Sequence, residues 1–191
     1  PYRLLAPLRC EKGLRVCVFG PNEDERTHLI ATALTKLKVR AVFVGRVAAY
    51  DFESLRQVSV RTSMHFPICF AEVSRGAGTA YEVQALVGSG KIVAAFSAGG
   101  SLATQFLNGL DTESRNFKLF EYDWREKDAS RPPPPSDVRK LTGVVKEALT
   151  WAKRRAGALR KELDRVFPWR RYEALPPAQA ISFSGTCRCE A

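Results

Sequence analysis

The chain has 191 residues, 45% of them hydrophobic, which is enough for one domain of ordinary size with an extension. No apolar run reaches the ~18 residues that a membrane-spanning helix needs, so we expect no transmembrane segment. The five cysteines are an odd number, and two of them, Cys17 and Cys69, fall in apolar runs. This pattern argues against the disulfide framework of a secreted protein. We also expect no metal site and no cofactor.

The formal net charge of +10 is spread unevenly along the chain. Residues 1–130 carry 17 basic and 14 acidic side chains, whereas residues 131–191 carry 13 basic and 6 acidic ones. A basic segment of this kind suits RNA, an acidic protein surface or anionic lipid headgroups. The alternative is a solvated helix face in a basic organelle protein.

Hydrophobic periodicity predicts alternating strands and helices in the first two thirds of the chain. Asn22 is the expected cap of the first helix, which follows the turn Gly20-Pro21. The predicted elements are an irregular arm at 1–14, strands at 15–20, 39–45, 65–72, 91–97 and 117–122, and helices at 22–37, 49–58, 79–87 and 101–107. Five strands alternating with helices indicate an α/β fold, a flavodoxin-like doubly wound parallel five-stranded sheet.

A proline run at 132–135 predicts a stiff spacer after this domain. Ser136 and Asp137 are expected to cap a long amphipathic basic helix at 138–166, and an irregular tail follows it. We therefore expect three parts, namely the arm at 1–14, the α/β domain at 15–130, and the Pro-linked helix and tail at 131–191.

The most informative motif is the turn that precedes the fourth strand. Gly78, Thr79, Tyr81 and Glu82 follow an apolar strand and open a helix, an arrangement that presents a carboxylate beside free backbone amides. This block resembles the nucleoside 2-deoxyribosyltransferase family, whose members carry an Asp-x-Gly-Thr-aromatic type of turn followed by Glu. The resemblance covers residues 15–125 and is firmest over 76–96.

The resemblance implies a role for each matching residue. Glu82 would attack the anomeric carbon of a 2′-deoxynucleoside as the nucleophile of a glycosidase-type reaction, and a second carboxylate would help the base to depart. Gly20 and Pro21 match the turn that ends the family's first strand. Together with Gly78 and Thr79, they are the expected ligand-binding residues.

The chain also departs from the family pattern. Gly76 stands where the family has an Asp, Gln84 replaces a small residue, and Phe19 is bulky where the substrate would approach. Glu72 could serve as the second acid, or it could be a solvated carboxylate at a strand end. Asp51 and Glu53 match the family more loosely. The alternative for the whole motif is a generic α/β turn with an incidental Glu.

These departures favour a pseudoenzyme over an active enzyme. We expect a non-catalytic accessory subunit of a large mitochondrial assembly, with a respiratory-chain or ATP synthase complex slightly ahead of the mitochondrial ribosome. Its partners would be other subunits, reached through 1–14 and 131–191, with rRNA or anionic lipid headgroups as further candidates. The start at Pro1, without a signal-peptide stretch, suits a processed matrix protein, or one at the matrix face of the inner membrane, and equally a trimmed chain. The alternative is an active deoxyribosyltransferase or N-glycosidase with Glu82 as nucleophile.

Overall fold

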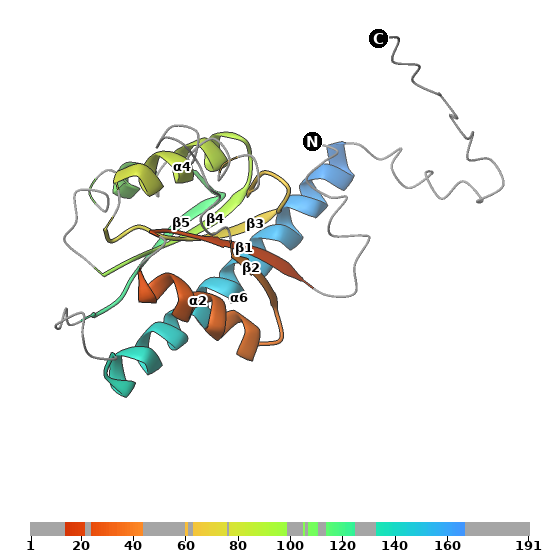
Figure 1. Ribbon diagram of the computed structural model, residues 1–191. Coiled ribbons are helices and arrows are strands. Elements are labelled where there is room, and N and C mark those ends of the chain that lie inside the picture. Colours follow the sequence, from red (N-terminus) through yellow and green to blue (C-terminus); the bar gives the residue numbers. More distant parts are fainter. Residues whose placement is uncertain are drawn as a thin grey trace, which may run out of the picture. The chain divides into compact units, whose positions relative to one another are not determined.

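The computed structural model describes residues 14–21, 24–43, 60, 63–75, 77–98, 105, 107–110, 114–124 and 133–166. Its centre is a five-stranded parallel sheet with the order β2-β1-β3-β4-β5, as Figure 1 shows. This is the flavodoxin-like strand order, so the predicted fold class is confirmed. The strands are β1 (Arg15–Phe19), β2 (Arg40–Phe43), β3 (Ile68–Glu72), β4 (Ile92–Ser97) and β5 (Phe117–Glu121), and the helices are α2 (Glu25–Lys36), α4 (Ala77–Gly88) and α6 (Pro135–Val166).

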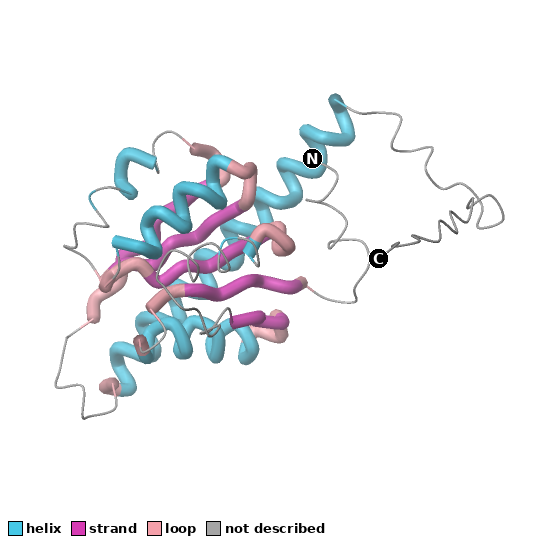
Figure 2. The backbone as a smooth tube through the Cα atoms, turned by 45° about the horizontal axis from the view of Figure 1, so that its top comes forward, coloured by secondary structure: helices cyan, strands magenta, loops and turns pink. Residues whose placement is uncertain are grey.

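Helices cover both faces of the sheet, with α4 on one face and α2 and α6 on the other (Figure 2). Under α4 lies a buried apolar cluster that includes Cys17, Phe19 and Val83. The opposite face carries a row of aromatic rings from three strands and α6. The ring centroids are 5.2 Å apart for Phe70–Phe96, 5.9 Å for Phe96–Phe120 and 6.0 Å for Phe120–Trp151. Burial on both faces explains why these strands appear in the sequence as short continuous apolar runs.

Two predicted element boundaries are corrected by local hydrogen bonds. The cap of α2 is Asp24, not Asn22, because the Asp24 carboxylate accepts the Arg26 amide at 3.0 Å. The third strand begins at Ile68 rather than His65, since the Phe66 amide is bonded to the Ser63 carbonyl in a turn. The predicted arm at 1–13, the helix at 49–58 and the tail beyond 166 lie outside the described residues. Of the predicted helix at 101–107, the described residues 105 and 107 are helical, and the helix continues to 110.

The long C-terminal helix starts earlier than predicted. It begins at Pro135 rather than Val138, because the first helical position needs no hydrogen-bond donor and therefore tolerates proline. Asp137 thus lies in the first turn, and its amide bonds the Pro134 carbonyl at 2.9 Å.

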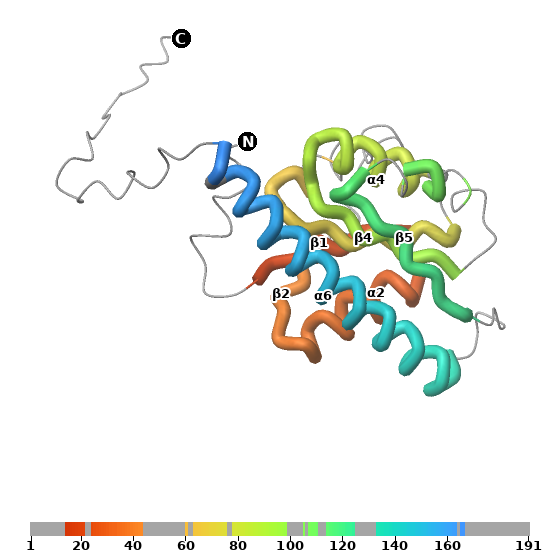
Figure 3. Tube along the Cα trace, turned by 180° about the vertical axis from the view of Figure 1, so that it is seen from behind, coloured from red at the N-terminus to blue at the C-terminus, as the bar shows by residue number. Residues whose placement is uncertain are grey.

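Part of this helix belongs to the domain core. Figure 3 shows α6 crossing the sheet beside α2. Its buried apolar side chains are those of Leu141, Val145, Ala148, Leu149 and Ala152. The chain divides into two compact units, Pro1–Gly157 and Ala158–Ala191, so the predicted boundary at 130/131 falls inside the first unit. Within the described residues, no helix is long and apolar enough to cross a bilayer.

Candidate functional site

Flavodoxin-like folds bind ligands in the crevice at the carboxyl ends of the strands, where the strand order reverses. In this sheet the reversal lies between β1 and β3, because β1 has β2 on one side and β3 on the other. The register pairs Phe19 with Ala71, so the turn after β1 and the end of β3 lie next to each other. The predicted residues Gly20 and Pro21 therefore do lie at the switch point.

The space beside Gly20 is filled by the chain itself. A Cβ atom placed on this residue would lie 2.7 Å from Thr27 Oγ1, 3.0 Å from Glu72 Cβ and 3.1 Å from the Glu72 carbonyl oxygen. All three distances are shorter than ordinary van der Waals contacts. Glycine is thus required here because β1 and α2 approach β3 closely. Gly20 was expected to leave space for a substrate. In the structure, Thr27 and Glu72 occupy this space.

Glu72 is the centre of a buried polar network at this edge, and its side chain is 0% exposed. Its Oε1 accepts the Tyr122 hydroxyl at 3.0 Å and also the Ser74 hydroxyl, while Oε2 accepts the Ser74 amide at 3.1 Å. The Arg26 guanidinium lies 3.9 Å from Oε1 and forms a two-pronged ion pair with Asp24. The network joins the carboxyl ends of β3 and β5 to the start of α2.

The network carries two carboxylates and one guanidinium in a nearly water-free setting. Burial raises the pKa of Glu72, and the charge of Arg26 and the hydrogen bonds from Ser74 and Tyr122 only partly offset this effect. Burial also raises the pKa of Tyr122, so its hydroxyl stays protonated and donates to Glu72. For Arg26, burial works against the charged form, but the hydrogen bonds that it donates to Asp24 and the charge of Glu72 outweigh burial and raise its pKa.

The two predicted acids lie on opposite faces of the sheet. Successive side chains of a strand point to opposite faces of the sheet. The Ala71 side chain belongs to the cluster under α4, so the Glu72 side chain points to the face covered by α2 and α6. Glu82 lies on α4, on the other face (Figure 1). Glu72 therefore does not pair with Glu82. It is also not the solvated strand-end carboxylate that the sequence allowed.

The predicted motif residues form the first half of α4. The helix begins at Ala77, two residues earlier than predicted, so Gly78 and Thr79 lie in its first turn and half-buried Glu82 lies in the second. The amides of a first turn have no partner within the helix, so Gly78 and Thr79 keep the donors that the motif predicted. Glu82 is close enough to Cys17 to affect it. The pKa of that thiol is lowered chiefly by its hydrogen bond with Cys69, and burial and the charge of Glu82 act in the opposite direction.

The two bulky departures from the family pattern behave differently. Phe19 is 1% exposed and belongs to the cluster with Val73, Ala80 and Val83, so its ring fills the space between the end of β1 and α4. Gln84 replaces a small residue of the family and was expected to crowd the site, but its side chain is exposed on α4.

One hollow in the described part of the chain lies beside β5 rather than at the switch point. It encloses about 530 Å³ and is lined by residues from the ends of β4 and β5 and from α6: Ala98, Glu121, Tyr122, Asp123, Lys140, Gly143, Val144 and Glu147. None of the predicted site residues lines it. Two of these lining residues, Lys140 and Asp123, form a salt bridge of 3.2 Å. Within the described residues, no three His, Cys, Asp or Glu side chains are grouped to hold a metal ion.

Sequence reasoning missed Asp24, Arg26, Ser74 and Tyr122 as partners of Glu72. One signal was present. Glu72 and Ser74 stand at the end of β3 and Tyr122 follows β5, and the carboxyl ends of parallel strands lie at the same edge of the sheet. Arg26 gave no such signal. Its acidic neighbours indicated a helix start, and nothing in the sequence showed that its side chain turns toward β3.

No protein-family model and no curated protein matches the chain. Among solved structures, the sugar isomerase domain of an RpiR transcription factor from Sphaerobacter thermophilus is similar at 12% identity, with a TM-score of 0.45, over 86% of this chain and 87% of that one. A diflavin flavoprotein A3 from Nostoc sp. is similar at 17% identity, with a TM-score of 0.46, over 76% and 97% of the two chains. We draw no conclusion about ligand or activity from these similarities, and the resemblance to deoxyribosyltransferases rests on the sequence motif alone.

Proposed function

We propose that this chain is a non-catalytic accessory subunit of a large mitochondrial assembly, built on a degenerate nucleoside 2-deoxyribosyltransferase-like domain. The observation that carries this proposal is that the chain's own side chains fill the space beside Gly20, at the switch point. Thr27 and Glu72 occupy the space beside Gly20, and Arg26, Ser74 and Tyr122 hold Glu72 in place. These contacts occupy the space beside Gly20, one of the residues expected to bind the ligand.

The motif also lacks the Asp that would be the second carboxylate of the family reaction. The family reaction needs two acids in different environments on the same side of the substrate. Here Gly76 replaces the expected Asp, and Glu72 points to the opposite face of the sheet from α4. Glu82 alone could form a glycosyl ester, but Glu72 does not lie on its side of the sheet to protonate the departing base.

The location and the partners remain part of the same proposal. A basic surplus in residues 131–191 suits an organelle assembly, and we keep a respiratory-chain or ATP synthase complex ahead of the mitochondrial ribosome. Because the inner side of α6 is buried up to Ala152, docking through this region would use the outer face of α6 and the segment beyond it.

The enzymatic alternative is retained because Glu82 is half-buried near the start of α4, as a nucleophile would be. A base-release assay separates the two functions. Purified full-length protein and the Glu82→Ala variant are incubated with each of the common 2′-deoxynucleosides, with and without a second free base as acceptor. We expect equal, background-level base release from both. Release by the wild type that Glu82→Ala abolishes would establish the alternative and refute the non-catalytic function.

A further inference from the structure

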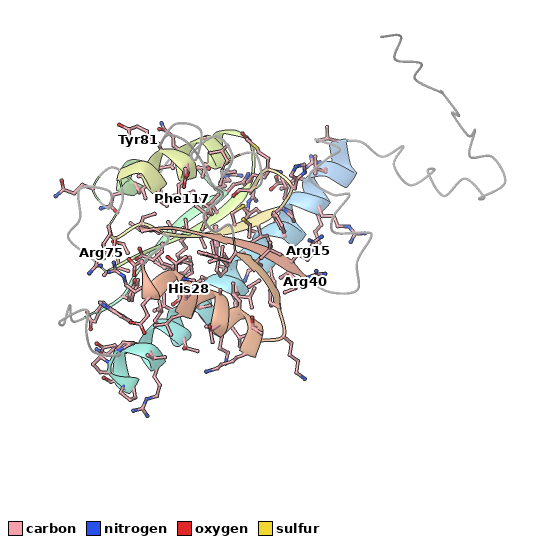
Figure 4. All side chains as sticks on the ribbon, in the orientation of Figure 1. Arg15, His28, Arg40, Arg75, Tyr81 and Phe117 are labelled. Atoms are coloured by element: carbon pink, nitrogen blue, oxygen red, sulfur yellow. The ribbon has the colours of Figure 1, made fainter. Side chains whose placement is uncertain are left out.

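The amino edge of the sheet gathers basic side chains, whereas the carboxyl edge holds acidic side chains together with Arg26, Arg75 (Figure 4) and Lys140. The first residue of each strand and the two residues before it include five basic and no acidic side chains among those described: Arg15, Lys38, Arg40, Lys91 and Arg115. The last residue of each strand and the two after it include three acidic and no basic side chains among those described: Glu72, Glu121 and Asp123.

Helix α6 adds to the basic edge. It runs antiparallel to β5, because Lys140 bonds Asp123 after the end of this strand and Arg155 bonds Asn116 just before its start, at 2.8 Å. The run Lys153-Arg154-Arg155 therefore lies at the amino edge. Figure 4 shows Arg15 and Arg40 together at this edge and Arg75 at the opposite end of the domain. We call the set Arg15, Lys38, Arg40, Arg115, Lys153, Arg154 and Arg155 the basic edge.

Contacts within the chain involve Arg15, Arg40 and Arg155, but the stability of the fold does not explain the exposed Lys38, Arg115, Lys153 and Arg154. Like charges gathered at one end of a compact domain repel each other and lower its stability. Cations near helix C-termini complement the helix dipole, but Arg15, Arg40 and Arg115 stand at strand starts, where this effect is absent. Lys38, Arg40, Arg115, Lys153 and Arg154 are exposed, so their charges reach solvent.

We infer that the basic edge binds the phosphate backbone of a double-stranded nucleic acid. Five of its seven residues are arginines, whose planar guanidinium groups match phosphate oxygens in a two-pronged geometry. Four strand spacings of ~4.8 Å separate β2 from β5, so the cations at the starts of β2, β1 and β5 lie within about 19 Å, and none of the set stands at the start of β3 or β4.

The composition of the edge argues against other polyanions. Protein interfaces depend on aromatic and apolar anchors, and membrane-surface helices need an apolar face. The large exposed apolar side chains among the described residues are Tyr81 and Val166, neither of which stands at a strand start. Single strands are held by exposed stacking rings, whereas the ring beneath Arg15 at this edge, Phe66, is buried. This inference concerns a different surface from the predicted site and does not depend on the proposed function.

Two matched variants of the full-length protein test the inference. The edge variant is Lys38→Gln/Arg115→Gln/Arg154→Gln, and the control is Arg75→Gln/Arg139→Gln/Lys140→Gln, which lowers the net charge equally but lies toward the carboxyl edge. All six side chains are exposed, so both variants should fold. Binding is measured with RNA and DNA duplexes of about 20 base pairs between about 50 and 200 mM salt, and with poly-glutamate and cardiolipin-containing vesicles.

We expect the edge variant to lose at least about tenfold in duplex affinity and to have a salt slope smaller by about 2.5 to 3, while the control stays close to wild type. Tighter binding of the RNA duplex than of the DNA duplex would identify RNA as the ligand. Equal binding would show that the basic edge accepts either duplex. The inference is overturned if both variants lose affinity equally, if no duplex binds, or if poly-glutamate or vesicles bind more tightly than either duplex.

Discussion

Deletion of residues 131–191 is expected to unfold the α/β domain, whereas deletion of 158–191 should leave it folded. The first deletion removes the buried side chains of Leu141, Val145 and Leu149 and exposes the aromatic row of the sheet. Burying one Leu or Val contributes about 1.5–3 kcal/mol, so these three contribute about 5–9 kcal/mol. That is comparable to the whole stability of a domain, which is about 5–15 kcal/mol. The second deletion removes none of the buried core residues.

Urea denaturation followed by far-ultraviolet circular dichroism measures this difference. The 1–157 chain should show one cooperative transition near that of the full protein, and the 1–130 chain should show none. A full-length Val145→Asp variant serves as the control, because it disrupts the same contact without shortening the chain. A cooperative transition in the 1–130 chain would show that α6 is an appendage, as the proline run in the sequence suggested.

Replacement of Arg26 by alanine is expected to cost about 3–5 kcal/mol of unfolding free energy at neutral pH. Arg26 is the cation in the network of two buried carboxylates, and it is 4% exposed. Its removal leaves Glu72 and Asp24 without a compensating charge in a site that water does not reach. The hydrogen bonds from Ser74 and Tyr122 remain, and they offset only part of this penalty.

The pH dependence of this loss identifies the group responsible. The pKa of Glu72 is raised by burial, so the native state binds its proton more tightly than the unfolded chain does. The resulting stability is fully present below the ordinary carboxyl pKa and is lost as the pH rises through the raised one. Removing Arg26 takes away a charge that lowers this pKa. We therefore expect the loss in Arg26→Ala to be smaller at about pH 5 than at about pH 8.

A double-mutant cycle isolates this effect. Glu72→Gln keeps the shape of the side chain and one acceptor oxygen but removes the charge, so the Arg26→Ala/Glu72→Gln protein should be more stable than Arg26→Ala alone at pH about 8. The part of the loss that remains in the double variant belongs to Asp24. If the loss is the same at both pH values and Glu72→Gln does not relieve it, Arg26 stabilises the domain through contacts of its aliphatic stem instead.

The fully buried strands could be located from the sequence because each appears as a short apolar run preceded by Gly or Pro or close to one. Ile68–Glu72 and Ile92–Ser97 are examples, buried along their entire length. The start of α6 was missed for a local reason. A proline run indicates a spacer, but its last member can also be the first residue of a helix, and only the packing of the following residues decides between these outcomes.

The sequence predicted that several motif residues lie toward the carboxyl edge, but it did not predict the contacts around Gly20. Gly20, Gly78 and Thr79 lie near the carboxyl ends of the strands, as expected. The sequence did not show that Glu72 would fill the space beside Gly20, because this depends on a long-range approach of α2 to β3 through Arg26. It also did not show that Glu72 and Glu82 face opposite sides, since that requires the position of α4 relative to the alternation along β3.

The native mass of the protein isolated from its source cells, with the copurifying chains identified by mass spectrometry, tests the central claim most directly. A non-catalytic accessory subunit should elute in a particle far larger than its 21.3 kDa chain, together with subunits of one mitochondrial assembly. Isolation as a small homo-oligomer without other subunits would contradict the proposed function.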